Sequence, residues 1–282
     1  MPSNTNSVDI GELFLTRARR QKRKIAIAIM RPIPETIESL RRASEYAELT
    51  VVGAEVQGFT NIIEPDADIA STKLVALLKD GHVDGIVRGQ VKDSFTLDEF
   101  HRQFGKEPLP SNRKVCPAVV KKGEYCFVMS TASVYQGITL EDKIYEVDRI
   151  IRYMKEDIGL EPKIAVMSSL RPTSKVGKYK LLDDIASINE ELTAYLKGKG
   201  SDVTEYYFEY ETAVWEGANL IVPSMGLVGN AWMKSLVYLG GWELLSCPYL
   251  DLGVVYEDGS RNEKEYFWHI VHAVAMANNA SR

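Results

Sequence analysis

The chain has 282 residues, a length that suits one large domain or two modest ones. Hydrophobic residues make up 45% and charged residues 26% of it, which excludes intrinsic disorder or a fibrous fold over the whole length. Its 34 basic and 39 acidic residues give a formal net charge of −5, which argues against a dedicated nucleic-acid binder, a class that is usually basic.

In the first part of the chain, predicted strands alternate with predicted helices. Short apolar runs with β-branched residues predict buried strands over 24–30, 49–52 and 83–87. Helical spacing of apolar residues predicts helices over 35–48, 66–79 and 95–104. Such alternation is typical of βαβ units and therefore indicates a mainly parallel sheet.

The middle of the chain begins with a different pattern. Two short runs, at 114–120 and 124–130, flank a Lys-Lys-Gly turn and predict a β-hairpin. Alternation then resumes, with helices predicted over 140–157, 178–197, 229–239 and 262–278 and strands over 163–168, 203–210 and 219–222.

Proline residues suggest where the chain divides. Pro108, Pro110 and Ser111 interrupt the pattern near 109–113, and a second crossing is expected near Pro248. The sequence therefore predicts a two-domain α/β fold with mainly parallel sheets. Residues 1–112 plus 249–282 would form one domain and residues 113–248 the other.

No feature points to export, a membrane or a metal. Cys116, Cys126 and Cys247 form no CxxC pair, which fits a reducing compartment. No stretch resembles a signal peptide or the roughly 20 apolar residues that span a bilayer. His269 and His272 share a face of the last predicted helix but lack a third ligand. We expect a cytoplasmic protein that binds no metal, nucleic acid or membrane.

Ligands of parallel α/β sheets bind beyond the carboxyl ends of the strands, so the loops there are the candidate sites. The first loop, 87–96, combines Arg88, Gly89 and Ser94 just before a helix, an arrangement that favours an anion. The alternative is that Ser94 or Thr96 merely caps that helix.

The second loop, 168–178, is rich in hydroxyl groups and cations, the donors that hold phosphate. The candidate ligands in it are Ser168, Ser169, Arg171, Thr173, Ser174, Lys175 and Gly177. A solvated loop with a helix cap is the alternative.

Two further loops complete the candidate site. Gly226, Gly229 and Asn230 lie in a glycine loop between a strand and a helix, where free backbone N–H groups bind an anion. In the last loop, we expect Ser260 and Arg261 to lie over a reacting group, with Asp258 holding Arg261. The alternative for the glycine loop is a tight connection between strand and helix that binds nothing. The alternative for the last loop is a simple turn.

Four segments resemble, in the same order, motifs of one known family. They are 84–89 (DG-x-V-x-G), 159–168 (G-I-E-P-x-V-A-M-L-S), 218–223 with Gly229 and Asn230 (A-N-V-L-I-F-P followed by G-N) and 258–261 (D-L-S-R). From about residue 67 to 277 the chain thus resembles the phosphate acetyl/butyryl transferase family, the phosphotransacetylase-like proteins. Within it, the chain resembles the MtxX branch, also called methanogen marker protein 4.

The resemblance implies an isocitrate/isopropylmalate dehydrogenase-like fold with a cleft between the domains. It implies transfer of an acyl group between phosphate and the thiol of coenzyme A. Ser260 and Arg261 would contact the acyl phosphate or its oxyanion, and the Ser-rich loop at 168–177 would hold phosphate. The resemblance also implies a homodimer, with no tightly bound cofactor and coenzyme A as a substrate.

Two departures from the family pattern accompany the resemblance. The Ser-rich loop carries an insertion that includes Arg171 and Pro172. The position of the family's catalytic Asp, seven residues past the Ser of its Ser-Arg pair, is Phe267. Glu263 or Glu265 replaces that Asp only if the start of the last helix is shifted.

Three functions remain open at this point. The first is a phosphate acyltransferase-like enzyme that acts on a small phosphate or acyl substrate. The second is an MtxX-like, methyltransferase-related protein of methanogen methyl metabolism, with methyltransferase subunits as partners and without acyltransferase activity. The third is a phosphate-binding module that keeps the ligand site but has no catalysis.

Overall fold

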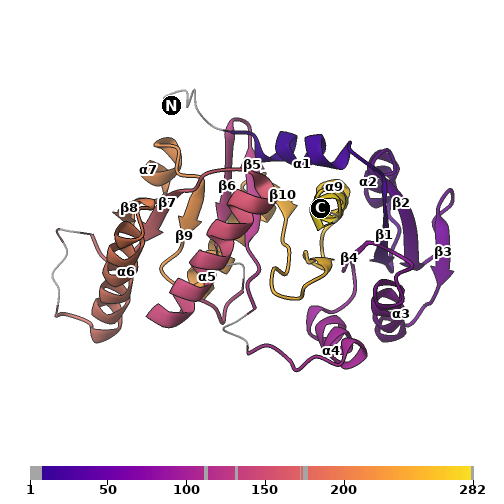
Figure 1. Cartoon of the computed structure of the whole chain (residues 1–282), viewed down its shortest axis with the longest axis horizontal. Helices are drawn as coiled ribbons and strands as arrows, with labels where there is room; N and C mark the ends of the chain where they lie inside the picture. Colours follow the sequence, from indigo (N-terminus) through magenta and orange to yellow (C-terminus); the bar gives the residue numbers. More distant parts are fainter. Residues whose placement is uncertain (1–7, 111–113, 131–132, 172, 174–176, 281–282) are drawn as a thin grey trace. The chain divides into compact units, whose positions relative to one another are not determined.

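The computed structural model describes residues 8–110, 114–130, 133–171, 173 and 177–280 (Figure 1). The chain forms two compact units. We call Gly11–Leu109 with Leu245–Arg282 the first unit, and Met1–Ile10 with Pro110–Leu244 the second unit. Each contains one sheet, and the predicted α/β class with mainly parallel sheets is confirmed.

The sheet of the first unit has five strands in the order β11-β4-β1-β2-β3, and every neighbouring pair is parallel. The strands are β1 (Arg23–Ile29), β2 (Ala47–Gly53), β3 (Thr60–Ile63), β4 (Gly85–Val87) and β11 (Val255–Glu257). Because β11 pairs with β4, the last part of the chain completes a sheet that the first part begins.

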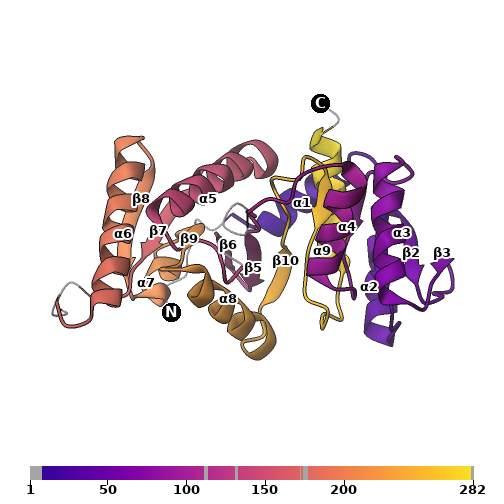
Figure 2. The same ribbon diagram turned by 90° about the horizontal axis from the view of Figure 1, so that it is seen from below.

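Helices cover both faces of this sheet. Ala26 and Ala28 of β1 join one apolar cluster with α3 (Ala67–Lys79) and α4 (Asp93–Phe104). Side chains of a strand alternate between faces, so the fully buried isoleucines of β1 point the other way. On that face α9 (Phe267–Ala280) packs against β1, β4 and β11. Figure 2 shows α9 lengthwise beside the sheet.

Two more helices complete the first unit. The helix α2 (Pro34–Ala43) packs against α9 and begins with a proline, which suits the first turn of a helix. The helix α1 (Ile10–Ala18) turns Phe14 toward α9, where its ring lies 4.5 Å from the ring of His272.

The sheet of the second unit has six strands in the order β10-β5-β6-β9-β7-β8. They are β5 (Ala118–Lys122), β6 (Tyr125–Met129), β7 (Lys163–Met167), β8 (Asp202–Tyr207), β9 (Leu220–Val222) and β10 (Glu243–Ser246). Strands β5 and β6 form the predicted antiparallel hairpin, whereas β6, β9, β7 and β8 run parallel to one another.

The helices of the second unit are α5 (Leu140–Arg152), α6 (Lys180–Gly198), α7 (Tyr210–Trp215) and α8 (Gly226–Lys234). Helix α5 continues as the π-helical segment η2 (Tyr153–Ile158), and α8 continues as η3 (Ser235–Leu239). Thr139 and Asp142 form a capping box that starts α5. Gly159, in the left-handed conformation, ends η2.

The structure also corrects several predicted elements. The helix predicted over 35–48 ends at Ala43, because residues 44–46 form a turn that leads into β2 at Ala47. The helix predicted from 229 begins at Gly226, and the last helix begins at Phe267 rather than at 262. Strands β3, β10 and β11 and helices α1 and α7 are additional. Among the residues that the structure describes, no helix is long and apolar enough to cross a membrane.

A side-chain cap at the start of α3 gives a test of this fold. Asp66 Oδ1 accepts hydrogen bonds from the backbone N–H groups of Asp68 (2.9 Å) and Ile69 (3.0 Å). We expect Asp66→Ala to lower the free energy of unfolding by about 1 kcal/mol, because two N–H groups lose their partner. Urea denaturation measures the change. Asp68→Ala is the control, since that side chain caps nothing, and equal losses in both variants would contradict the capping role.

Candidate functional site

The carboxyl ends of β4 and β11 bring together two predicted site residues that are 170 positions apart. Val87 pairs with Glu257, so the next residues, Arg88 and Asp258, lie side by side. The Arg88 backbone N–H donates to the Glu257 carbonyl oxygen at 2.9 Å, and its Nε forms an ion pair with the Asp258 carboxylate. Arg88 is only 3% exposed.

The other two guanidinium nitrogens of Arg88 also donate hydrogen bonds within the protein. Its Nη1 donates to the carbonyl oxygens of Gly89 and Val91, and its Nη2 donates to that of Gly259. Each guanidinium nitrogen therefore has a protein acceptor. In this arrangement Arg88 fixes the loops after β4 and β11, and Asp258 holds Arg88 rather than Arg261, contrary to the expectation from the sequence.

Burial raises the pKa of the Asp258 carboxyl to about 6, and the nearby charge of Asp93 contributes to the rise. The positive charge of Arg88 opposes this effect. At neutral pH the carboxyl is therefore mostly ionised and remains paired with Arg88.

The loop after β4 is shaped by its glycine. Gly89 has a φ of +65°, and a Cβ there would lie 2.1 Å from the carbonyl oxygen of Ala28, so only glycine fits. Ser94 is exposed in the first turn of α4 and does not cap it. The Thr96 hydroxyl donates to the Lys92 carbonyl oxygen at 2.7 Å. No side chain thus caps the N-terminus of α4 at its N-cap residue, Lys92.

Ser260 and Arg261 lie in the loop that Arg88 fixes. The Ser260 N–H donates to Glu263 Oε2 at 3.0 Å. Arg261 is exposed, and its side chain forms no ion pair with the described residues. Glu263 is 9% exposed, and its Oε1 accepts no hydrogen bond within the described part of the chain. Gly259 leaves the space for it, because a Cβ there would lie 2.5 Å from Glu263 Oε2.

Behind this loop, one buried carboxylate holds both histidines of α9. Glu257, 1% exposed, has its Oε2 at 3.0 Å from His269 Nδ1 and its Oε1 against His272 Nδ1. The opposite ring nitrogen, His269 Nε2, lies 3.3 Å from Glu263 Oε2. The two histidines therefore serve a carboxylate network. Within the described residues no His, Cys, Asp or Glu cluster suits a metal ion.

The charges of this network stabilise one another. Burial by itself would lower the pKa of His269, but the charge of Glu263 and the hydrogen bond to Glu257 raise it well above its ordinary value. Burial would raise the pKa of Glu257, yet His272 and His269 lower it below its ordinary value. The surroundings thus favour a charged imidazolium at His269, between the side chains of Glu257 and Glu263.

The second unit gathers predicted residues at the carboxyl ends of β7 and β9, which are neighbours in its sheet. Ser168, after β7, is 2% exposed, and its hydroxyl has no partner within the described residues. The Ser169 hydroxyl donates to the Leu182 carbonyl oxygen at 2.8 Å. Gly226 starts α8, and its N–H donates to the Gln136 carbonyl oxygen at 3.0 Å.

The remaining predicted residues of the second unit have separate places. Gly229 and Asn230 lie in the first two turns of α8. Arg171 is paired with Glu209 at 2.7 Å, and the Gly177 N–H donates to Asp183 at 2.9 Å. Thr173 is exposed. Ser174 and Lys175 lie outside the described residues.

A lysine that the sequence analysis did not single out lies at this edge of the sheet. Lys143, 2% exposed, donates to the carbonyl oxygen of Pro223, after β9, at 2.8 Å. Burial lowers its pKa to about 8, against the charge of Glu146. The signal was present: Lys143, Val147 and Ile150 have helical spacing on one buried face of α5.

Comparisons with known proteins agree with this architecture. No family model matches the chain. It is 28% identical to a protein of Methanosarcina acetivorans that carries the provisional name methyltransferase mtx subunit X, over 96% of this chain and 94% of that one. A protein of the same name from Methanosarcina mazei is 26% identical over 95% of each chain.

Solved structures share the fold at low sequence identity. A branched-chain phosphotransacylase from Enterococcus faecalis has a TM-score of 0.61 and 18% identity, covering 92% of this chain and all of that one. The EutD phosphotransacetylase from Staphylococcus aureus has a TM-score of 0.60 and 15% identity, covering 98% and 99%. The chain therefore has a phosphotransacetylase-like fold, and its resemblance to the MtxX branch is confirmed.

Proposed function

We propose that the chain is a phosphate acyltransferase-like enzyme that transfers an acyl group between phosphate and coenzyme A. The observation that carries the proposal is the loop of Ser260 and Arg261. Arg88 fixes this loop, because its guanidinium binds the Asp258 carboxylate and the Gly259 carbonyl oxygen. A fixed loop that leaves one guanidinium exposed is suited to bind the phosphate or oxyanion of an acyl phosphate.

In this reaction the thiolate of coenzyme A attacks the acyl carbon, a C–S bond forms, and the C–O bond to phosphate breaks. Arg261 would stabilise the charge on the acyl phosphate, and the Ser260 hydroxyl would donate a hydrogen bond to the developing oxyanion. Arg88 and Asp258 act as positioning residues, because they bind the loop rather than solvent.

The thiol of coenzyme A must lose its proton. Phe267, at the position that the resemblance assigns to the family's catalytic Asp, cannot accept it. Phe267 starts α9 and packs against Tyr46, with the Arg42 guanidinium 4.4 Å from its ring centre. Because α9 begins later than predicted, Glu263 remains in the loop beside Ser260. We propose Glu263 as the proton acceptor, since its Oε1 is buried and has no hydrogen-bond donor among the described residues. Coenzyme A is then a substrate rather than a resident cofactor.

Thioester formation from coenzyme A with acetyl, propionyl or butyryl phosphate tests the activity. We expect turnover by the wild type and a loss of about 100-fold or more in Arg261→Ala and in Ser260→Ala, because each variant removes a donor to developing charge. Arg102→Ala is the matched control, since that exposed arginine of α4 is paired with Glu99 at 2.6 Å and belongs to none of the candidate loops. No turnover by the wild type with any acyl phosphate would exclude the proposal.

The base is tested separately. Glu263→Gln keeps the size and one acceptor oxygen of the side chain, and we expect kcat to fall by about 100-fold or more because proton acceptance is lost. Glu265→Gln is the control, because Glu265 is exposed and paired with Arg42 at 3.5 Å. Equal activity of the two variants would show that the proton goes elsewhere.

A second function is favoured by the names of the relatives. Two proteins matched along nearly their whole length are named as subunits of a methyltransferase. A methyltransferase-related role with partner subunits, without acyl transfer, is therefore the competing proposal. Co-purification of the tagged chain with methyltransferase or corrinoid subunits, together with absence of acyl transfer, would favour it. A homodimer that turns over acyl phosphate by itself would exclude it.

A further inference from the structure

The second unit contains a hollow that none of the predicted site residues lines. Its volume is about 630 Å³, within the range of pockets for small molecules. It lies at the turn of the β5–β6 hairpin, between α7 on one side and α8 with η3 on the other. Strands β6 and β7 belong to the same parallel set. Tyr125, which lines the hollow, is the first residue of β6, whereas Ser168 follows the last residue of β7. The hollow and Ser168 therefore lie at opposite ends of these strands.

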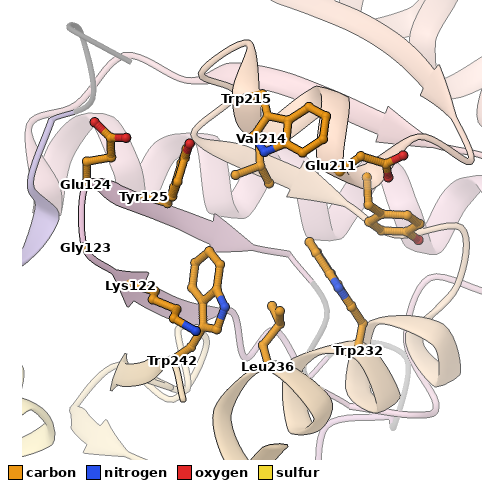
Figure 3. A pocket seen from close by; sticks show the side chains of 11 residues that line it. Lys122, Gly123, Glu124, Tyr125, Glu211, Val214, Trp215, Trp232, Leu236 and Trp242 are labelled. Carbon is orange, nitrogen blue, oxygen red and sulfur yellow. The ribbon is translucent and has the colours of Figure 1, made fainter. Parts of the chain in front are cut away.

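Aromatic side chains dominate the lining. Figure 3 shows Trp215, Trp232 and Trp242 around the opening, with Val214 and Leu236 between them. We call this site the aromatic hollow. Among the four tryptophans of the whole chain, only Trp268 lies elsewhere.

The rings of the aromatic hollow are fixed by packing beneath it. The buried Phe127 stacks on Trp232, with ring centres 5.6 Å apart, and meets Trp242 edge-on at 5.4 Å. Tyr210 supports Trp232 at 4.6 Å. Trp215, in contrast, is 43% exposed and free to meet a ligand. The binding surface is therefore largely pre-organised, which lowers the entropy lost on binding.

The charges around the aromatic hollow disfavour an anion. Glu124 and Glu211 are exposed at its edge (Figure 3). Among the described residues the lining has one basic side chain, Lys122, which donates to the Gly240 carbonyl oxygen at 2.5 Å. The lining thus has a formal charge of −1. A phosphate-bearing ligand would meet two carboxylates, whereas a cation would be attracted by both.

We propose that the aromatic hollow binds a small organic cation with an alkylated nitrogen, of the quaternary ammonium class. Indole and phenol faces attract such a charge through their quadrupole. An apolar lining offers few hydrogen-bond acceptors, so an ammonium with N–H groups would lose its bonds to water, while an alkylated nitrogen has none to lose. The Tyr125 hydroxyl, buried and unpartnered among the described residues, would bond a polar substituent of the ligand.

Calorimetry with the full chain tests the proposal, with choline and its neutral isostere 3,3-dimethylbutan-1-ol as probes. The two have the same shape, so we expect choline to bind about fivefold or more tightly because of its charge. Equal affinities would overturn the cation assignment, and no binding of either probe would overturn the site.

Variants locate the binding. We expect Trp215→Ala to weaken choline binding about tenfold, because the exposed indole is lost without disturbing the packed rings. Trp268→Ala, in the first unit, is the matched control and leaves the affinity unchanged. Glu211→Gln weakens choline but not the neutral isostere. The wild type could instead be a dimer that binds neither probe and that dissociates in the Trp215→Ala variant. In that case the hollow is an interface between copies of the chain, and the proposal is wrong. Acyl transfer by the wild type is measured in a separate assay, so a failure to bind choline does not contradict the proposed acyl transfer.

Discussion

The candidate site of the first unit depends on one ion pair, between the buried guanidinium of Arg88 and the partly buried carboxylate of Asp258. Arg88 and Asp258 follow neighbouring strands, and the same guanidinium also binds the Gly259 carbonyl oxygen, so two loops are joined through a single side chain. Breaking a buried pair by removing one partner costs about 3–5 kcal/mol, because the other charge stays buried without compensation. The Arg88 side chain therefore fixes the turn that precedes Ser260 and Arg261.

The same loop is supported from α9 by a second set of buried charges. The imidazolium of His269 lies between the carboxylates of Glu257 and Glu263, and Glu263 in turn accepts the Ser260 N–H. Glu263 is thus held by a histidine 6 positions along the chain and by a backbone group within its own loop. The late start of α9 follows from these contacts, since residues 258–263 are engaged in them rather than in a helical turn.

The comparison with phosphotransacetylases is informative in its differences. The fold is shared. Phe267, which the sequence resemblance assigns to the position of the family's catalytic Asp, packs its ring against Tyr46 under the Arg42 guanidinium. A phenylalanine there extends the apolar core of the first unit. Glu263 remains in the loop as a carboxylate close to Ser260. In the second unit, Lys143 supplies a buried cation near the carboxyl end of β9, on the same face of α5 as the buried Val147 and Ile150.

The sequence by itself determined the alternating α/β architecture, because apolar runs and helical spacing are local signals. Strand β1, helix α3, the β5–β6 hairpin and the start of α5 follow from it directly. It also located the loops that carry Arg88 and Ser260. Only the tertiary structure decided that β11, with three residues, pairs with β4, since so short a strand is stabilised by its neighbours rather than by its own pattern. Likewise, the partner of Asp258 and the burial of Glu257, Lys143 and Glu263 depend on contacts between distant segments, which no local pattern encodes.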